Sequence, residues 1–365
     1  MVRRIKIFIS GILWLAVSAA QAQQFEQTKT IDQSFAVNAN TSVQISHKYG
    51  DVQVVPWDKD SVHIITTVKV TNKKLSEVER ILNNIDMKFT NTPYYLTAST
   101  QFKNSRGAWQ ESLSDFANSI LSSGNKFEIT SVIMMPSKNS LTISNKYGNV
   151  FIADHSAPLK ITISNGDLKA MNLTGETSLD LSFCNATISS VTQAKMSLGY
   201  SEVTLKKANK ITLDSRSSKL WITKISTLEL ISKRDKINID TVGTLSGQSD
   251  FSSFQLGTVL ENISLKTFYG DMNLSNAGTL FKYIQLNSEY TDISLGFPQA
   301  ATFSFTSDYK RTTVIVPPTY TNLKKEMLNE KDQIYKMNGF VNAETQPAAS
   351  VQINALSGTI TLISK

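Results

Sequence analysis

The sequence is poor in the residues on which disulfide-rich, metal-dependent and many catalytic proteins rely. Among 365 residues there is one cysteine, Cys184, and there are three histidines. A single cysteine excludes an intrachain disulfide, so burial and backbone pairing must hold the fold together. The histidines, His47, His63 and His155, lack a partner at the short spacing of a metal-binding pair. The sequence therefore predicts no metal site and no cofactor.

The net charge of the chain is also small. The formal net charge is +7, and it falls to +4 when the three basic residues of the first 22 positions are removed. This weak, dispersed positive charge does not indicate binding to nucleic acid. The sequence contains no P-loop, dinucleotide fingerprint, His-Glu-x-x-His or Gly-x-Ser-x-Gly string. We therefore expect a protein that is not an enzyme.

Only one long apolar run is present, and it lies at the start of the chain. Basic residues come first, the run covers Ile7–Ala20, and the small-x-small sequence ending at Ala22 follows. This order is typical of a secretory signal peptide over residues 1–22, cleaved after Ala22. An uncleaved membrane anchor is the alternative, but the run is shorter than the ~20 apolar residues of a spanning helix. We expect an exported protein of the periplasm, cell surface or extracellular space.

Short alternating segments recur after residue 40, separated by turns. Residues 43–55 and 141–153 share a Tyr-Gly-Asp or Tyr-Gly-Asn turn between alternating flanks, and further copies follow to residue 362. The apolar residue after each turn recurs at steps of roughly 18 residues, which favours coils of two short strands and two turns. These residues are Val150, Leu168, Ile188, Val203, Leu220, Ile237, Phe254, Met272, Ile293 and Val314.

Stacked coils of this kind predict an all-β fold, a single-stranded β-solenoid. We expect the signal peptide at 1–22, an N-terminal β-rich module with one or two short helices at 23–140, and the solenoid at 141–365 with an insertion at 318–345. At each turn the inward residues are an odd number of positions apart, so the chain bends there. The turn glycines, such as Gly50 and Gly148, are expected to have a positive φ.

Three segments depart from the repeat. Lys73–Met87 has apolar residues at helical spacing and predicts an amphipathic helix. Residues 104–125 predict a second helix, which either covers a sheet edge or makes a peripheral contact with a membrane or partner. The charged segment Tyr320–Phe340 predicts a surface loop with a helical turn.

On these residues the sequence resembles the putative-adhesin domain family of bacterial cell-envelope proteins, common in Bacteroidota. The shared pattern is a signal peptide, a strand–Tyr-Gly-Asp–strand unit at 43–55, a helix-bearing insertion with a strand ending in Met135-Pro136, and a run of Gly-Asp or Gly-Asn turns. It covers roughly residues 30–365. The resemblance implies a β-solenoid and a role in adhesion or in the envelope, and it supplies no catalytic residues.

Tyrosines recur at the turns, one per coil. Tyr49, Tyr147, Tyr269 and Tyr290 occupy equivalent positions, with Tyr200 near a further turn. Core packing or shielding of the corner is one interpretation. The other is an exposed row that binds glycan or an exported protein, since aromatic side chains dominate such contact surfaces.

Two acidic residues occupy equivalent turns of successive coils, Asp271 and Asp292. They are expected about 5 Å apart across the stack. Such a pair can act as acid and base on a sugar, bind a cation, or accept hydrogen bonds from the turn backbone.

The leading hypothesis for function is a non-catalytic exported envelope or surface protein that binds glycan or protein through the solenoid face, like an adhesin. A carbohydrate-active solenoid enzyme and a structural or regulatory envelope component remain alternatives.

Overall fold

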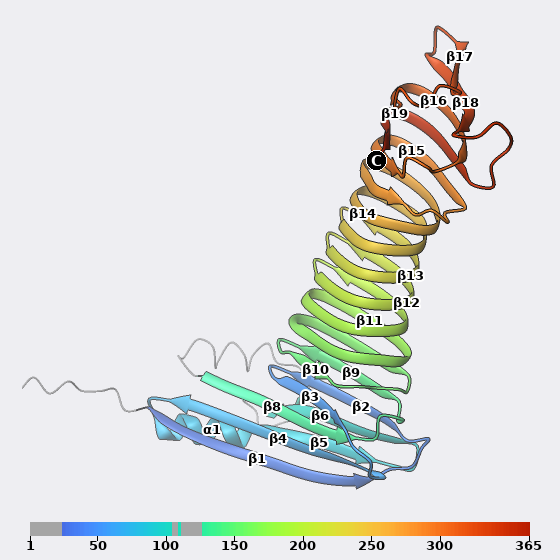
Figure 1. Cartoon of the computed structure of the whole chain (residues 1–365). Helices are drawn as coiled ribbons and strands as arrows, with labels where there is room; N and C mark the ends of the chain where they lie inside the picture. Colours follow the sequence, from blue (N-terminus) through green and yellow to red (C-terminus); the bar gives the residue numbers. More distant parts are fainter. Residues whose placement is uncertain (1–23, 104–108, 111–125) are drawn as a thin grey trace, which may run out of the picture.

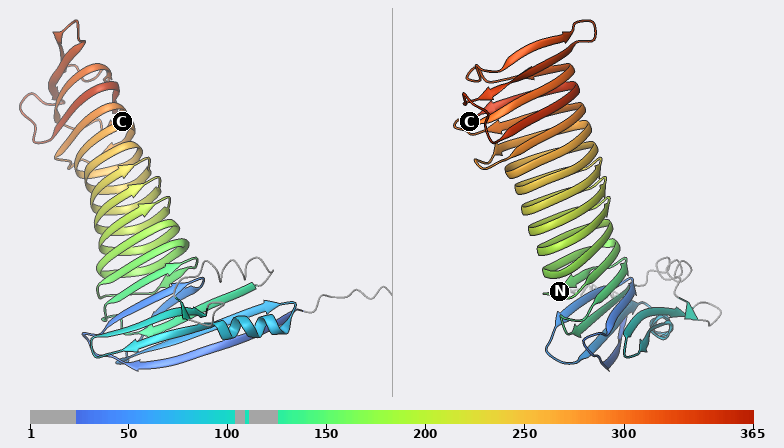
Figure 2. Two further views of the ribbon diagram at one scale, coloured as in Figure 1. Left: turned by 180° about the vertical axis from the view of Figure 1, so that it is seen from behind. Right: turned by 90° about the vertical axis from the view of Figure 1, so that its right-hand side faces the viewer.

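The computed structural model describes residues 24–103, 109–110 and 126–365. The predicted signal peptide lies outside these residues, as does the predicted second helix except for Trp109–Gln110, which form a short strand. Within the described residues the chain is nearly all β, with one short helix, and its strands belong to one large, unclosed sheet. Figures 1 and 2 show the sheet wound into a long stack, with the N-terminal strands at one end.

The N-terminal strands form a base on which the stack stands (Figure 1). Antiparallel pairs join β1 to β4, β4 to β8, β5 to β6 and β6 to β7, whereas β6 and β8 pair in parallel with β2 and β3. The bounds are β1 (Phe25–Ala36), β2 (Ser42–Lys48), β3 (Asp51–Pro56), β4 (Ser61–Asn72), β5 (Ile85–Asn91), β6 (Tyr95–Lys103), β7 (Trp109–Gln110) and β8 (Lys126–Met135).

Helix α1 (Leu75–Asn84) covers one part of this base. Its inward residues Val78, Ile81 and Leu82 pack with Val68 and Ile129 in a small separate core. The amphipathic spacing predicted this helix, although the predicted range was longer at both ends. Ile85 has extended backbone, so the chain leaves the helix there and continues as β5.

The stack begins with β2 and β3, on which β9 (Leu141–Lys146) and β10 (Val150–Ile152) lie in parallel register. Four long strands then continue it, each following the path of the chain 17 or 18 residues earlier. They are β11 (Leu159–Gly199), β12 (Glu202–Arg216), β13 (Lys219–Lys233) and β14 (Lys236–Ala277). We call one such turn of the chain a coil. Leu220 pairs with Ile237, for example, and Val150 with Leu168.

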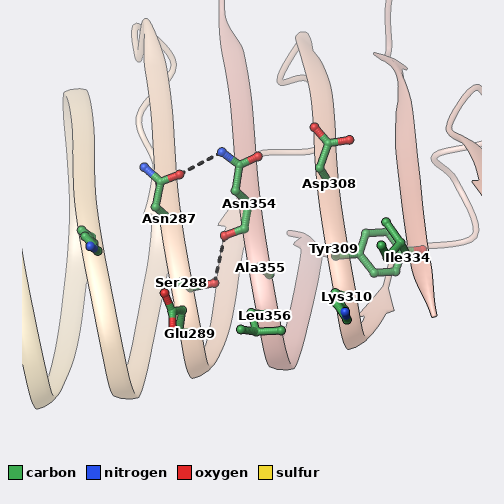
Figure 3. A pocket seen from close by; sticks show the side chains of 11 residues that line it. Asn287, Ser288, Glu289, Asp308, Tyr309, Lys310, Ile334, Asn354, Ala355 and Leu356 are labelled. Atoms are coloured by element: carbon green, nitrogen blue, oxygen red, sulfur yellow. Dashed lines mark hydrogen bonds between the residues drawn. The ribbon is translucent and has the colours of Figure 1, made fainter. Parts of the chain in front are cut away.

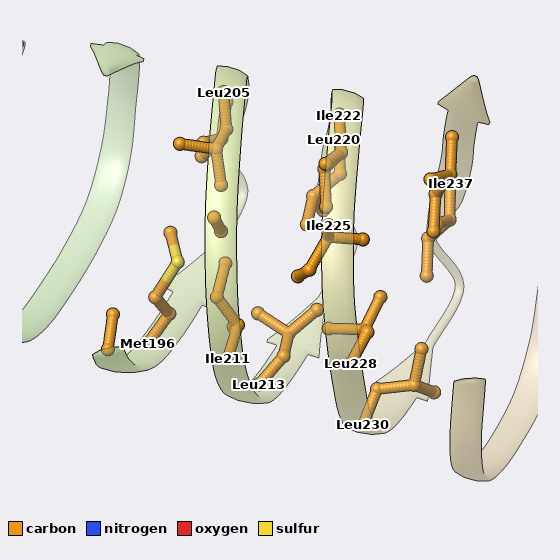
Figure 4. Close-up of a cluster of buried hydrophobic side chains, with 14 of the residues drawn as sticks. Met196, Leu205, Ile211, Leu213, Leu220, Ile222, Ile225, Leu228, Leu230 and Ile237 are labelled. Atoms are coloured by element: carbon orange, nitrogen blue, oxygen red, sulfur yellow. The ribbon is translucent and has the colours of Figure 1, made fainter. Parts of the chain in front are cut away.

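Each coil places a small set of apolar side chains inside. In β13 these are Leu220, Ile222, Ile225, Leu228 and Leu230, and the same positions of the coils on either side stack against them (Figure 4). Strict alternation is broken in three places per coil, after Ile222, after Ile225 and before Asp235. The expected two turns per coil are therefore wrong. At these bends successive inward residues are three positions apart instead of two, so a pattern of period two does not reveal the bends.

One recurrence residue was also misassigned. The register partner of Val203 is the buried Ala186, not Ile188. Alanine is small enough that a search for large apolar residues passes over it. The step from Ala186 to Val203 is 17 residues, the same as the step from Val203 to Leu220.

The last coils are not stacked in sequence order. Strand β15 (Tyr283–Phe297) pairs with β19 (Ser350–Ser364), and β19 pairs on its other edge with β16 (Phe303–Ile315). Ile360 thus lies between Ile293 and Val314, which the sequence had predicted as neighbours. Because every coil has the same alternating pattern, this pattern cannot predict the order in which the coils stack.

The insertion at 318–345 contains a hairpin instead of the expected helical turn. Strands β17 (Lys324–Asn329) and β18 (Ile334–Val341) pair with each other, and β18 pairs antiparallel with β16. The hairpin therefore covers the edge of β16 that β19 does not reach. Backbone groups on that edge are satisfied in this way, at the far tip of the stack (Figure 1).

We expect Leu228→Ala to lower the free energy of unfolding by about 2–5 kcal/mol, because Leu228 is fully buried between equivalent residues of two coils. The exposed neighbour offers the control, and Glu229→Ala should change stability by less than ~0.5 kcal/mol. Chemical denaturation followed by circular dichroism measures both. Equal losses in the two variants would contradict the assigned core.

Candidate binding surface

One corner of every coil has a residue with left-handed backbone. The φ angles at this corner lie between 48° and 61°. We call these residues the corner row. In stacking order they are Tyr49, Tyr147, Asn165, Phe183, Tyr200, Ser217, Arg234, Phe251, Tyr269, Tyr290, Ser357 and Arg311. The four tyrosines predicted from the sequence all belong to this row.

The expectation that glycine supplies the positive φ is wrong for the first coils. There the preceding tyrosine or asparagine is left-handed, and Gly50, Gly148 and Gly166 are not. Glycine is needed for a different reason: a Cβ at Gly148 would lie 2.0 Å from the carbonyl oxygen of Gly50. The glycines therefore permit close approach between coils, while Gly270 and Gly358 do have a positive φ.

Backbone hydrogen bonds fix the spacing along the corner row. The amide of Tyr49 donates to the carbonyl of Lys146 at 2.9 Å, and the amide of Ser217 donates to the carbonyl of Lys233 at 2.9 Å. The amides of Tyr147, Tyr200 and Arg234 likewise donate to the residue that precedes the next corner. Neighbouring corner residues are therefore one strand spacing apart, about 4.8 Å.

The aromatic side chains of the row stack on one another at this spacing. Ring centroids are 4.9 Å apart for Tyr49 and Tyr147, and 4.7 Å apart for Tyr269 and Tyr290. The predicted row therefore falls into two stacked pairs far apart along the stack. Tyr147, Tyr269 and Tyr290 are 38–44% exposed, so these three side chains are not packed in the core. Tyr49 is half-buried against Phe127, and burial raises its pKa, with the Tyr147 hydroxyl adding to the effect.

Planar side chains other than tyrosine also belong to the corner row, and sequence reasoning did not assign them to it. Phe183 stacks on Tyr200 at 5.1 Å, and Phe251 stacks on Tyr269 at 5.0 Å. The guanidinium of Arg234 lies 6.0 Å from the Phe251 ring. The 17- or 18-residue step counted from Tyr147 leads to all of these positions. Because phenylalanine or arginine replaces tyrosine at these positions, a pattern based on residue identity does not detect them.

An outward polar row lies two residues beyond the corner row. Its members are Asp51, Asn149, Asp167, Asn185, Glu202, Lys219, Lys236, Ser253, Asp271 and Asp292. Neighbours along it are bonded: the Lys219 ammonium is 2.5 Å from the Glu202 carboxylate, and the side-chain amide of Asn185 donates to the Asp167 carboxylate at 3.1 Å. The surface therefore places hydrogen-bonding groups directly beside the exposed rings.

The acidic pair predicted from the sequence lies in this polar row. Asp271 and Asp292 are register partners in adjacent coils, and both are exposed. Asp271 accepts a hydrogen bond from the side chain of Ser253 at 2.6 Å.

An inward polar row lies between the two outward ones. Ser201, Ser218, Asp235 and Ser252 are buried, and each side chain accepts a hydrogen bond from the backbone amide at the same position of the preceding coil. Asp235 also accepts from the Ser232 hydroxyl at 2.7 Å. Burial raises the pKa of Asp235, and these hydrogen bonds oppose the rise in part.

The other titratable groups that the sequence singled out are structural. Cys184 is buried, and burial raises the pKa of its thiol. Burial lowers the pKa of His47 and of His155 to about 4. His47 is hydrogen-bonded to the Thr100 side chain. Within the described ranges no group of three His, Cys, Asp or Glu residues could hold a metal ion.

Cavities lie on the face formed by the residues that precede the corner row. One cavity of about 380 Å³ lies where β19 separates β15 from β16, and Asn287, Asn354 and Asp308 line it (Figure 3). A second, of about 630 Å³, is lined by Asp214, Ile231 and other residues of the neighbouring coils. Both cavities extend the exposed surface away from the rings.

Comparison with known proteins gives weak likenesses only. No family model matches the chain, and no curated protein does. Among solved structures, a putative adhesin from Parabacteroides merdae is 12% identical, with 93% of this chain and 96% of that chain covered and a TM-score of 0.34. A putative adhesin from Bacteroides fragilis is 11% identical, with coverages of 92% and 97% and a TM-score of 0.27.

A putative lipid binding protein from Parabacteroides distasonis matches to a similar degree, with 8% identity, coverages of 92% and 96%, and a TM-score of 0.33. Solved structures described as putative adhesins of Bacteroidota thus match along most of the chain, as the sequence resemblance predicted. Identities and TM-scores this low transfer no activity to this chain. In the part of the chain that the structure describes, no helix is long and apolar enough to span a membrane.

We expect the Asp235→Asn variant to lose a pH dependence of stability that the natural protein has. Because the pKa of Asp235 is raised on folding, the folded state binds its proton more tightly than the unfolded chain does. The contribution of Asp235 to the free energy of unfolding is therefore full below the ordinary pKa of 3.8 and falls as the pH rises towards the folded value.

Urea denaturation of both proteins at a series of pH values between about 3.5 and 7 measures this difference. The comparison uses the slope of the unfolding free energy against pH, because the asparagine also changes the hydrogen bonds with Ser218 and Lys233 and so shifts the absolute stability. An identical slope in the two proteins would show that Asp235 is not the titrating group.

Proposed function

We propose that this protein is an exported, non-catalytic surface protein that binds glycan through its corner row, in the manner of an adhesin. The wound sheet is a β-solenoid with a repeat of about 18 residues, which residues 141–365 continue from an N-terminal module at 23–140. Export rests on the basic, apolar and small-x-small order of residues 1–22.

The observation that carries this proposal is the exposed aromatic row with polar side chains beside it. Sugar rings have apolar C–H patches and a rim of hydroxyl groups, so they need aromatic faces and hydrogen-bonding groups together. Phe183, Tyr200 and Tyr290 supply exposed faces, and the polar row supplies donors and acceptors within the next two residues. Stacked rings also lose little conformational freedom on binding, since their neighbours already hold them.

Glycan is favoured over a protein ligand because a row of polar groups runs beside the corner row along its length. The core of a typical protein interface is depleted of charged residues, whereas Lys219, Glu202 and Lys236 stand beside the middle of this one. A protein ligand is the other outcome that a binding experiment can give.

Asp271 and Asp292 belong to this surface as hydrogen-bonding groups. Their exposure and the hydrogen bond from Ser253 favour this role over that of an acid and base pair. Release of sugar from polysaccharides that is lost in Asp271→Asn would overturn this assignment.

The test is a glycan-binding screen of residues 23–365 and of a Phe251→Ala/Tyr269→Ala double variant. Removing two neighbouring rings should weaken the binding of retained glycans at least about tenfold, since rings of this kind dominate contact surfaces. Tyr94 is 77% exposed but lies outside the row, so Tyr94→Ala is the matched control and should bind normally.

Undiminished binding by the double variant would contradict the proposal, as would retention of protein ligands alone. Thermal unfolding of all three proteins checks that the double variant is folded.

A further inference from the structure

The corner row is interrupted at three points by a short polar residue. Asn165 lies between Tyr147 and Phe183, Ser217 between Tyr200 and Arg234, and Ser357 between Tyr290 and Arg311. Both neighbours of each short residue carry a planar group. We call these positions the three gaps.

The gaps arise from side-chain identity alone. Asn165, Ser217 and Ser357 have φ angles of 58°, 53° and 59°, within the range of the ring-bearing corners. Backbone hydrogen bonds continue through them, as the bonds from Tyr147 to Ser164 and from Ser217 to Lys233 show. A planar side chain is therefore missing at a position where the backbone would hold one.

The width of a gap follows from the stacking distances. Neighbouring rings of the row are 4.7–5.1 Å apart. With one ring missing, the flanking groups are two strand spacings apart, about 10 Å. A ring placed midway would lie about 4.8 Å from each flank, which is the distance the protein itself uses between stacked side chains.

The flanking groups are accessible to a ligand. Phe183 is 60% exposed, Tyr200 is 54% exposed, and Tyr147 and Tyr290 are 44% exposed. Arg234 and Arg311 are exposed as well. The guanidinium group is planar and weakly hydrated, and it stacks on flat partners as an aromatic ring does.

The rim of each gap is polar. Asp167 and Asn185 lie beside the Asn165 gap, and their side chains are 3.1 Å apart. Lys219 lies beside the Ser217 gap and Thr359 beside the Ser357 gap. A ligand ring in a gap therefore meets planar groups on both faces and hydrogen-bonding groups at its edge, which suits a sugar better than an aromatic side chain of a protein.

We propose that each gap binds one pyranose ring, held between the two flanking planar groups, and that it selects rings of the β-gluco configuration. This inference rests on the proposed glycan binding and names its ligand class. A ring contacted on both faces must present C–H groups on both. Only a chair with all its hydroxyls equatorial does so, whereas an axial hydroxyl would be desolvated against a flanking group without a partner.

The test fills the gaps. A triple variant, Asn165→Tyr, Ser217→Tyr and Ser357→Tyr, places tyrosine on a backbone conformation that Tyr147, Tyr200 and Tyr290 already adopt, so the fold should tolerate it. The control is the triple variant Asn165→Ser, Ser217→Asn and Ser357→Asn, in which the gaps remain. The probes are methyl β-glucopyranoside, and methyl β-galactopyranoside with its axial hydroxyl, titrated by saturation-transfer NMR.

The natural protein and the control should bind the glucoside about tenfold more tightly than the galactoside. The gap-filled variant should lose binding of the glucoside, although it has more aromatic surface. Unchanged or tighter glucoside binding in the gap-filled variant would overturn the inference, and so would equal binding of the two sugars by the natural protein.

This result is separable from the proposed function. Phe251 and Tyr269 flank no gap, but Arg234 and Tyr290 stack on them, so the gap whose flanks the double variant leaves untouched is the one at Asn165. Polymer binding that is lost in that double variant but kept in the gap-filled variant would sink the gap inference alone. If the natural protein retains no glycan at all, both proposals fail.

Discussion

Parallel stacking of successive coils at one strand spacing is the constraint on which the rest of this structure depends. Hydrogen bonds between a coil and the next fix the backbone of every position against its counterpart, as Leu220 is fixed against Ile237. A coil of this size cannot enclose a core by itself, because only about five apolar side chains point inward in it. Repetition therefore supplies both the core and the regular outer surface.

The same constraint turns a local feature into a surface. One left-handed residue in a single turn has no particular consequence, but twelve in register form a straight row. Side chains attached there can only stack or leave a gap, since the spacing is set by the backbone. The close approach of coils at this corner also explains why Gly50, Gly148 and Gly166 precede the polar row, where a Cβ would meet the carbonyl of the coil before.

In several coils that lack a glycine after the corner residue, a buried polar side chain occupies this position. Ser201, Ser218 and Asp235 accept the backbone amides that point inward at this corner. Burial of Asp235 costs free energy, because its carboxyl group is desolvated there. Hydrogen bonds from three neighbouring donors offset this cost. The corner is thus held from inside while its outer side chains remain free to meet a ligand.

The sequence by itself determined the β-rich class, the first helix and the tyrosines of the corner row, because each depends on local periodicity or on recurring residue identity. It could not determine the order of the last coils, since β19 fits beside β15 or beyond β16 with the same alternation. Nor could it locate the left-handed residue in each turn, which depends on the approach of one coil to the next. The row of stacked rings and its gaps exist only in the assembled stack, where residues 17 or 18 positions apart become neighbours.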